Sequence, residues 1–405
     1  MQTALLKQIL ASPEGQEAES ILRACVHCGF CTATCPTYQL LGDELDGPRG
    51  RIYLIKQMLE GQTVSRSTRL HLDRCLSCRA CETTCPSGVR YGRLLDIGRE
   101  QVERQVPRPT LQRLLRWSLR QLLPYPRRFG ALLRLGQLAR PLLPAPLGRK
   151  VPEQQRSMTR PQGDHPRHML LLEGCAQSVA TPLTNDVAAR VLDRLGISLL
   201  SSPGAGCCGA VSHHLGAGDE ALLFMRRNID AWWPAIEAGA EAILISASGC
   251  GVMVKEYGPL LRNDPLYRDK AQRVSELAKD LSEILTTEDL APLGIDGAGR
   301  RIVFQSPCTL QHGQQLNGVV ESILRRLGFE LTPVANPHLC CGSAGTYSIL
   351  QPGLSKRLLE DKLSSLEQGD PELIATANVG CQLHLQTAAN RPVRHWVELL
   401  DPAAG

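Results

Sequence analysis

The chain has 405 residues, with 45 basic and 40 acidic side chains and a formal net charge of +5. This length predicts two to four domains with ample hydrophobic core. No run of about 18 apolar residues occurs, so no transmembrane helix is expected, and the first residues lack the hydrophobic region of a signal peptide. Sixteen cysteines without an export signal indicate a reducing, cytosolic compartment in which thiolates bind metals.

The first quarter of the chain carries the pattern C-x2-C-x2-C-x3-C-P twice. A [4Fe–4S] cubane needs four thiolates, of which one such loop supplies three, and in paired-cluster ferredoxins the fourth is the Cys before Pro of the other motif. Zinc sites or a disulfide framework suit this spacing less well. The sequence therefore predicts one cluster on Cys25, Cys28, Cys31 and Cys85, and a second cluster on Cys75, Cys78, Cys81 and Cys35.

The stretch between the two motifs is long enough for helices. Ile52, Ile55 and Leu59 recur at helical spacing and predict a helix over Pro48 to Leu59. Basic residues flank the ligand loops, and they either raise the potential of a nearby cluster or are ordinary solvated charges. These residues are Arg23, Arg74, Arg79 and Arg90.

The region that follows the second motif is strongly basic. Residues 104–152 contain no Asp or Glu and eleven Arg or Lys side chains. Leucines repeat at helical intervals around Trp117 and again around Leu135, with prolines between the two runs. Such a basic amphipathic segment is typical of an element that docks on a membrane surface or on a partner. A linker whose leucines pack on the chain's own domains explains the pattern equally well, and residues 151–167 are expected to be extended.

The second half of the chain is an internal duplication. A single Cys, a Cys-Cys-Gly and another Cys occur in each half, and the corresponding cysteines are 131 to 133 positions apart. The eight cysteines are Cys175, Cys207, Cys208 and Cys250 in the first repeat, and Cys308, Cys340, Cys341 and Cys381 in the second.

Each repeat predicts a small parallel sheet with crossover helices. Short apolar runs precede Cys175 and Cys308, and a second strand is expected at 242–246 and at 372–376, each followed closely by Cys250 or Cys381. Ligands of open α/β sheets bind at the carboxyl ends of the strands, which is where these cysteines are expected. The pattern therefore predicts a site for a prosthetic group, and it leaves open which group fills it.

The predicted fold is a multi-domain α+β protein. A helical two-cluster ferredoxin-type domain is expected at 1–103 and a basic, Pro-rich linker at 104–166. Two duplicated α/β Cys-Cys-Gly domains are expected at 167–296 and 297–405.

Longer stretches resemble a known family. They are residues 23–38 and 42–52 around the first motif, 228–234 (Asn-Ile-Asp-Ala-Trp-Trp-Pro), and 339–347 (Leu-Cys-Cys-Gly-Ser-Ala-Gly-Thr-Tyr). The chain resembles the iron–sulfur subunits with two ferredoxin motifs and two Cys-Cys-Gly domains, and within that family these stretches favour the glycolate oxidase branch. The likeness covers nearly the whole chain.

The resemblance implies an electron-transfer subunit of a bacterial glycolate dehydrogenase complex. A separate FAD-binding subunit would oxidise glycolate to glyoxylate, and this chain would carry the electrons towards a quinone-type acceptor. Two [4Fe–4S] clusters are implied, with the eight cysteines of the repeats as candidates for a further one. The expected location is cytoplasmic and peripheral on the inner membrane. No catalytic residue and no nucleic-acid partner are expected in this chain.

Other functions remain open. The chain could serve a related lactate or glycerol-3-phosphate dehydrogenase, or act as a heterodisulfide-reductase-like catalytic subunit. The last possibility needs a fifth Cys in each repeat, and Met253 and His384 stand at those positions. A redox sensor or a scaffold is another alternative. Gly204 to Gly209 formally matches G-x-G-x-x-G, but the match includes the Cys pair and does not follow a first strand, so dinucleotide binding is disfavoured.

Overall fold

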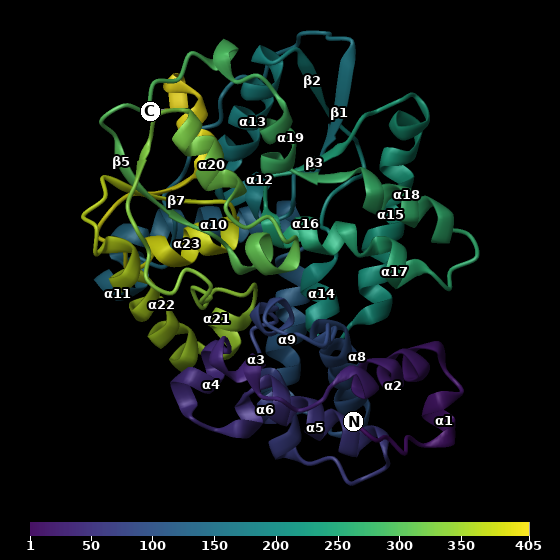
Figure 1. Cartoon of the computed structure of the whole chain (residues 1–405). Helices are drawn as coiled ribbons and strands as arrows, with labels where there is room; N and C mark the ends of the chain where they lie inside the picture. The colour runs from purple at the N-terminus through teal and green to yellow at the C-terminus, as the bar shows by residue number, and fades with distance from the viewer. Residues whose placement is uncertain (405) are drawn as a thin grey trace. The chain divides into compact units, whose positions relative to one another are not determined.

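The computed structural model describes residues 1–404 (Figure 1). The chain forms two compact units. Unit 1 comprises Met1–Trp117 together with His338–Leu358, and unit 2 comprises Ser118–Pro337 and Leu359–Gly405. A short segment of the second repeat, with its Cys-Cys-Gly, is therefore part of unit 1.

Among the residues that the structure describes, the regular elements of unit 1 are all helices. They are α1 (Lys7–Leu10), α2 (Pro13–Ala24), α3 (Phe30–Ala33), α4 (Pro36–Leu41), η1 (Glu44–Asp46), α5 (Pro48–Leu59), α6 (Arg66–Asp73), α7 (Ala80–Thr83), α8 (Tyr91–Gln105), the first part of α9 (Thr110–Leu122), α21 (Tyr347–Leu350) and the start of α22 (Pro352–Glu367).

Local sequence explains where these helices begin. The Ser12 hydroxyl accepts a hydrogen bond from the Gly15 N–H at the start of α2, and Ser65 and Thr68 form a capping box at α6. Pro48 is the first residue of α5, where its missing N–H costs nothing. Helix α5 has the bounds predicted from its apolar spacing, and its buried side packs on α8.

Unit 2 contains two four-stranded parallel sheets, one for each repeat. The first has the order β2-β1-β3-β4 and the second β6-β5-β7-β8. The strands are β1 (Arg167–Leu171), β2 (Ile197–Ser201), β3 (Ile243–Ile245), β4 (Ala278–Asp280), β5 (Arg301–Gln305), β6 (Glu330–Leu331), β7 (Leu373–Thr376) and β8 (Val393–His395).

Alternation along the strands divides the core of unit 2. Met169 and Leu171 face a cluster that continues into the second sheet, through residues such as Ile302, whereas Leu170 faces a separate cluster around Trp232. Both faces of the first sheet are therefore buried, as expected for parallel strands covered by crossover helices. The shared cluster joins the two repeats within unit 2.

Besides the remaining parts of α9 and α22, the described helices of unit 2 precede, connect or follow these strands. They are α10 (Pro126–Ala139), η2 (Arg140–Leu142), α11 (Ala145–Gly148), α12 (Gln177–Ala180), α13 (Pro182–Arg194), α14 (Ala210–His214), α15 (Gly218–Glu237), α16 (Ser248–Lys255), α17 (Tyr257–Leu261), α18 (Arg268–Leu277), α19 (Leu281–Thr287), η3 (Ala291–Leu293), the π-helical turn η4 (Thr309–Gly313), α20 (Val319–Arg326), α23 (Val379–Gln386), η5 (Trp396–Leu400) and η6 (Pro402–Ala404).

The predicted fold class is confirmed, because a helical N-terminal part precedes two parallel-sheet repeats. One detail differs: the strands expected as second in each repeat, β3 and β7, are third in chain order. Strands β2 and β6 were not predicted, because they are edge strands and lack a continuous buried apolar run. None of the helices that the structure describes is long and apolar enough to span a membrane.

Candidate iron–sulfur cluster sites

The two ferredoxin motifs fold into loops of the same conformation. The second residue after the first Cys is left-handed in both, at His27 (φ 58°) and Ser77 (φ 54°), and so is the fourth, at Gly29 (φ 86°) and Arg79 (φ 62°). Residues other than glycine are uncommon in the left-handed region of backbone conformation. The backbone strain that they cause there concentrates at functional sites. Each loop then enters a one-turn helix, α3 or α7, which carries the third Cys of its motif.

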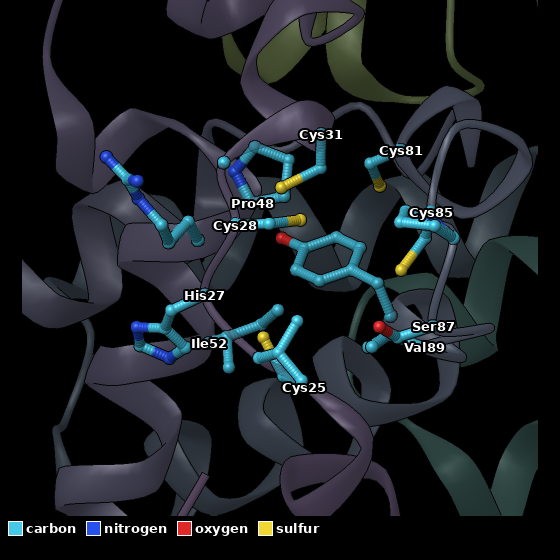
Figure 2. A pocket seen from close by; sticks show the side chains of 15 residues that line it. Cys25, His27, Cys28, Cys31, Pro48, Ile52, Cys81, Cys85, Ser87 and Val89 are labelled. Atoms are coloured by element: carbon cyan, nitrogen blue, oxygen red, sulfur yellow. The ribbon is translucent and has the colours of Figure 1, made fainter.

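The first site is an open cavity lined by both motifs. Cys25, Cys28 and Cys31 of the first loop and Cys85 of the second all line it (Figure 2). The cavity measures about 430 Å³ of space between atoms, part of it open to solvent. Cys85 is the fourth ligand that the sequence predicts for this site from the other motif.

At the first site, burial and the neighbouring thiols raise the pKa values of Cys31 and Cys25. Desolvation is the main cause for Cys31, whose pKa rises to about 11, and the neighbouring Cys25, Cys28 and Cys85 add to it. Desolvation also raises the pKa of Cys25, with Cys85 and Cys28 contributing. Because burial and neighbouring thiols oppose the ionisation of Cys25 and Cys31, a bound cation that replaces their protons is favoured here.

The second site is more enclosed. Cys35, Cys75, Cys78 and Cys81 are all buried. Desolvation raises the pKa of Cys81 well above its usual value, and the side chains that reinforce this are Cys78, Cys75 and Cys35, in that order. Cys81 also lines the cavity of the first site, so the two sites are neighbours within unit 1.

Backbone and side-chain donors point at the sulfurs. The Ser77 N–H lies 3.4 Å from Cys75 Sγ, and the Tyr91 hydroxyl lies 3.6 Å from the same atom. Hydrogen bonds to cluster sulfurs are one of the means by which proteins adjust reduction potentials, so these donors suit thiolate ligands.

A buried ionic network adjoins the second site. Asp46 is fully buried and receives Arg74 at 2.7 Å, His71 at 3.0 Å and Arg51 at 3.4 Å. Arg51 is 1% exposed and donates through Nε to the His71 carbonyl. Cys75 and Cys35 are among the groups whose negative charge would stabilise the Arg51 guanidinium. A permanent positive charge therefore lies near the enclosed site.

The four cysteines of the first repeat come together in unit 2. Cys175 hydrogen-bonds with Cys207, Cys207 with Cys208, and Cys208 with Cys250. The hydrogen bond with Cys207 and burial raise the pKa of Cys175 well above its usual value. Cys175 follows β1 and Cys250 lies in α16 after β3, so the site stands at the carboxyl ends of the central strands, as predicted.

The Cys-Cys-Gly loop of this repeat is held by buried polar side chains. Asn228 donates to the Cys207 carbonyl at 2.9 Å, and the Tyr257 hydroxyl donates to the Cys208 carbonyl at 2.9 Å. Gly209 has φ 91°, and its N–H lies 3.4 Å from Cys207 Sγ. The loop thus presents its thiols in a fixed arrangement.

The second repeat uses the same loop geometry. Gly342 has φ 89°, its N–H lies 3.4 Å from Cys340 Sγ, and its carbonyl accepts a hydrogen bond from Ser355. Within unit 1, the Tyr347 hydroxyl donates to the Arg74 carbonyl at 3.0 Å. All four cysteines of this repeat, Cys308, Cys340, Cys341 and Cys381, are buried.

In unit 2, three cysteine-bearing loops are tied together. The Ser248 hydroxyl lies 2.7 Å from that of Thr309, and the Asn378 amide donates to Ser248 at 3.1 Å. These residues stand two before Cys250, one after Cys308 and three before Cys381. The carboxyl-end loops of the two sheets therefore meet.

Several residues that shape these sites were not recognised from the sequence. Asp46, Tyr91, Tyr257 and Tyr347 act through contacts with residues distant in the chain, and no local pattern marks them. Asn228 lies in a stretch that carries the family resemblance, but nothing in that stretch indicates its contact with the Cys207 carbonyl. Gly29 and Arg79 occupy equivalent positions of the two motifs, and both have a left-handed backbone. Alignment of the two motifs could have indicated this conformation, because one of them has glycine there.

Comparison with known families agrees with this arrangement. Residues 21–89 match the 4Fe-4S dicluster domain, and residues 169–255 and 302–386 each match the Cysteine-rich domain. The glycolate oxidase iron–sulfur subunit of Escherichia coli is 59% identical over 404 residues, which cover 100% of this chain and 99% of the relative. The chain belongs to the family of glycolate oxidase iron–sulfur subunits.

More distant relatives show how far the likeness extends. A probable glycolate oxidase iron–sulfur subunit of Bacillus subtilis is 29% identical and covers 99% of the chain and 98% of the relative. Lactate utilization protein A of Geobacillus kaustophilus is 28% identical over 52% of the chain and 89% of the relative. A crystal structure of a hypothetical protein from Helicobacter pylori shares the fold, with a TM-score of 0.58 at 10% identity, covering 97% of this chain and 73% of that one.

Proposed function

We propose that this chain is the electron-transfer subunit of a glycolate-oxidising complex. In this proposal a partner FAD subunit oxidises glycolate to glyoxylate, and the chain passes the electrons on towards a quinone-type acceptor. The observation that carries the proposal is the assembly of two four-thiol sites in unit 1. Belonging to an oxidoreductase complex agrees with the names of the full-length relatives.

The ligand assignment follows the grouping of the thiols. We assign Cys25, Cys28, Cys31 and Cys85 to one [4Fe–4S] cluster, and Cys75, Cys78, Cys81 and Cys35 to the other. Bound there, the clusters supply one-electron transfer. The protein's own residues bury the thiolates, direct N–H and O–H donors at their sulfurs, and hold the Arg51 guanidinium near the second site.

The two sites differ in access, and this supports a direction for electron entry. Cys28 is exposed, and the apolar side chains of Val26 and Phe30 beside it are 68% and 60% exposed. The cysteines of the second site are all buried. We therefore place the contact with the flavin subunit at the face around Cys28.

The four thiols of the first repeat fit a further cluster. Cys175, Cys207, Cys208 and Cys250 form a continuous set of hydrogen-bonded thiols with a backbone donor at Cys207. Four thiolates are the ligand number of an ordinary [4Fe–4S] cluster. We propose that this site binds a third cluster, with Cys308, Cys340, Cys341 and Cys381 as candidates for another.

Coverage favours glycolate over lactate as the substrate of the complex. The relatives named for glycolate oxidase match 99% of the chain or more, whereas the lactate utilization protein matches only 52%. The alternative of a lactate dehydrogenase subunit is thereby less well supported.

The test compares two substitutions in the first site. Cys28→Ser removes a thiol, whereas Ser87→Ala changes another side chain lining the same cavity without touching a ligand. In the complex with the flavin subunit, glycolate should still reduce the flavin in both variants. Reduction of a quinone analogue should be lost only in Cys28→Ser, together with one cubane EPR signal. Unchanged quinone reduction in Cys28→Ser would refute the relay.

A further inference from the structure

Exposed apolar side chains are concentrated in one short segment of the chain. Among the described residues, eighteen large apolar side chains are exposed, and nine of them lie between positions 111 and 147. A segment of 37 residues thus holds half of them. The nine are Leu111, Leu114, Leu115, Trp117, Leu132, Leu135, Leu138, Leu142 and Leu147.

Helix α10, in unit 2, shows how this surface is built. Leu132, Leu135, Leu138 and Leu142 follow one another at intervals of three, three and four, so they share one face of α10 and its continuation η2. Their exposed fractions are 51%, 64%, 78% and 88%, which rise along the helix. We call these four side chains the leucine face.

The opposite side of α10 is held against unit 2. A Cβ at Gly130 would lie 3.4 Å from the Val179 side chain of α12, and one at Gly136 would lie 3.5 Å from that of Val151. Gln137 donates to the Pro152 carbonyl. Since α10 is anchored on this side, the leucine face is turned outward by packing.

The charge of the segment identifies its partner. Residues 104–152 contain no Asp or Glu. Arg127, Arg134, Arg149 and Lys150 are exposed, and none of them pairs with a carboxylate among the described residues. Arg127 and Arg134 lie on α10, seven residues apart and therefore on one side of it. A surface of leucines bordered by unpaired cations fits a layer that is apolar inside and negatively charged outside.

We propose that the leucine face and its neighbouring cations dock unit 2 on an anionic lipid bilayer surface. The helix would lie in the plane of the interface, with leucines among the acyl chains and cations at the lipid phosphates. The exposed Leu147 of α11 lies in the same segment and would add to the contact. The earlier alternative, in which the leucines pack on the chain's own domains, does not fit the exposed leucines of this face.

The docking surface is directly linked to the thiol site of the first repeat. Tyr125 is the N-cap residue of α10, and its ring lies 5.8 Å from that of Phe224. Phe224 packs in one buried cluster with Cys175 and Cys207. Docking through α10 would therefore bring this site close to the lipid surface, and the use of that proximity for delivery to a quinone rests on the proposed function.

The experiment measures binding of the full-length holoprotein to lipid vesicles. Vesicles of phosphatidylcholine alone are compared with vesicles containing about 30% phosphatidylglycerol, at low and high salt. The test variant is the double substitution Leu135→Gln with Leu138→Gln. The matched control is Leu223→Gln with Leu266→Gln, two leucines elsewhere in unit 2 that are 63% and 78% exposed. Arg127→Gln with Arg134→Gln tests the charge.

The wild type and the control should bind anionic vesicles, and more weakly at high salt. The leucine-face variant should bind the vesicles at least about tenfold more weakly than the wild type, because two inserted side chains are lost. The arginine variant should lose the preference for anionic lipid. Equal vesicle binding by the leucine-face variant and the wild type would overturn the proposal. The proposal would also be overturned if the leucine-face variant kept its vesicle binding and instead lost its binding to the flavin subunit.

A second readout separates this proposal from the proposed function. Reduction of a soluble dye by glycolate in the assembled complex should be the same in the leucine-face variant as in the wild type. If dye reduction fails in the wild type while vesicle binding holds, the relay is wrong and the docking surface stands. If dye reduction holds while no protein binds anionic vesicles, the docking surface is wrong and the relay stands.

Discussion

The two compact units are stabilised in different ways. Unit 2 has two parallel sheets and a continuous apolar core that joins both repeats. Among the described residues, the regular elements of unit 1 are all helices, and several of them are a single turn long. Its core includes the thiols of Cys25, Cys75 and Cys81. Unit 1 holds ten of the sixteen cysteines. The comparison indicates that unit 1 depends on its clusters for folding, whereas unit 2 has a core of its own.

Removal of iron should give the largest difference between the units. Metal binding supplies folding free energy where a site does not exist in the unfolded chain. After anaerobic chelation, the amides of α5 and α8 should lose most of their protection from hydrogen exchange, whereas β1 and β5 should keep theirs. Protein incubated in the same buffer without chelator is the control. Full protection of α5 and α8 in iron-free protein would contradict the comparison.

Substitution of Arg51 should destabilise unit 1 strongly. Arg51→Met leaves Asp46 fully buried with one cation fewer, and breaking a buried ion pair costs about 3–5 kcal/mol. Arg49→Met is the matched control, because it removes a partly exposed pair with Glu44, typically worth about 0–1 kcal/mol. Thermal unfolding of the holoprotein checks both. Equal losses in the two variants would show that the Asp46 network is not a structural element of unit 1.

Acid should weaken unit 2 through His395. Burial lowers the pKa of His395 to about 4, and its neutral ring bridges the repeats, lying 3.0 Å from the Ser246 carbonyl and 3.3 Å from the Val397 N–H. Because the unfolded chain takes up this proton near pH 6.5 and the folded chain only near pH 4, stability falls as the pH drops through that interval. The loss reaches about 3 kcal/mol.

The variant His395→Gln isolates this contribution. Burial raises the pKa of Asp280 and of Glu398 to about 6, and these carboxyls favour the fold at low pH, so they act in the opposite sense. The difference between wild type and variant removes their effect. The wild type should lose more stability than His395→Gln between pH 6.5 and pH 4, measured by denaturant unfolding. Parallel curves would mean that His395 is not held neutral.

A smaller effect should distinguish two glycines near the second Cys-Cys-Gly. Both Gly342 (φ 89°) and Gly345 (φ 63°) are left-handed, so alanine costs about 1–2 kcal/mol at either. A Cβ at Gly342 would also lie 2.6 Å from the Ser355 carbonyl oxygen, whereas one at Gly345 meets nothing within 4 Å. Gly342→Ala should therefore lower the unfolding temperature more than Gly345→Ala. Equal shifts would show that this loop adjusts freely.

The sequence predicted the cysteine groups more successfully than their surroundings. Spacing alone indicated the duplication and the two ferredoxin motifs, because metal ligation requires fixed intervals along the chain. It could not predict that Arg51 and His71 converge on Asp46, since such pairs form only after helices pack. It also did not reveal that His338–Leu358 belongs to unit 1, because contacts such as Tyr347 to Arg74 link residues 273 positions apart.

The most direct test is iron and acid-labile sulfide per chain in anaerobically purified protein, with EPR during stepwise reduction. Three sites of four irons predict about twelve irons or more, and the variant Cys208→Ser should lose about four of them while the two interacting signals of unit 1 remain. Zinc in place of iron, or a wild-type iron content that Cys208→Ser leaves unchanged at about eight, would contradict the account of three cluster sites.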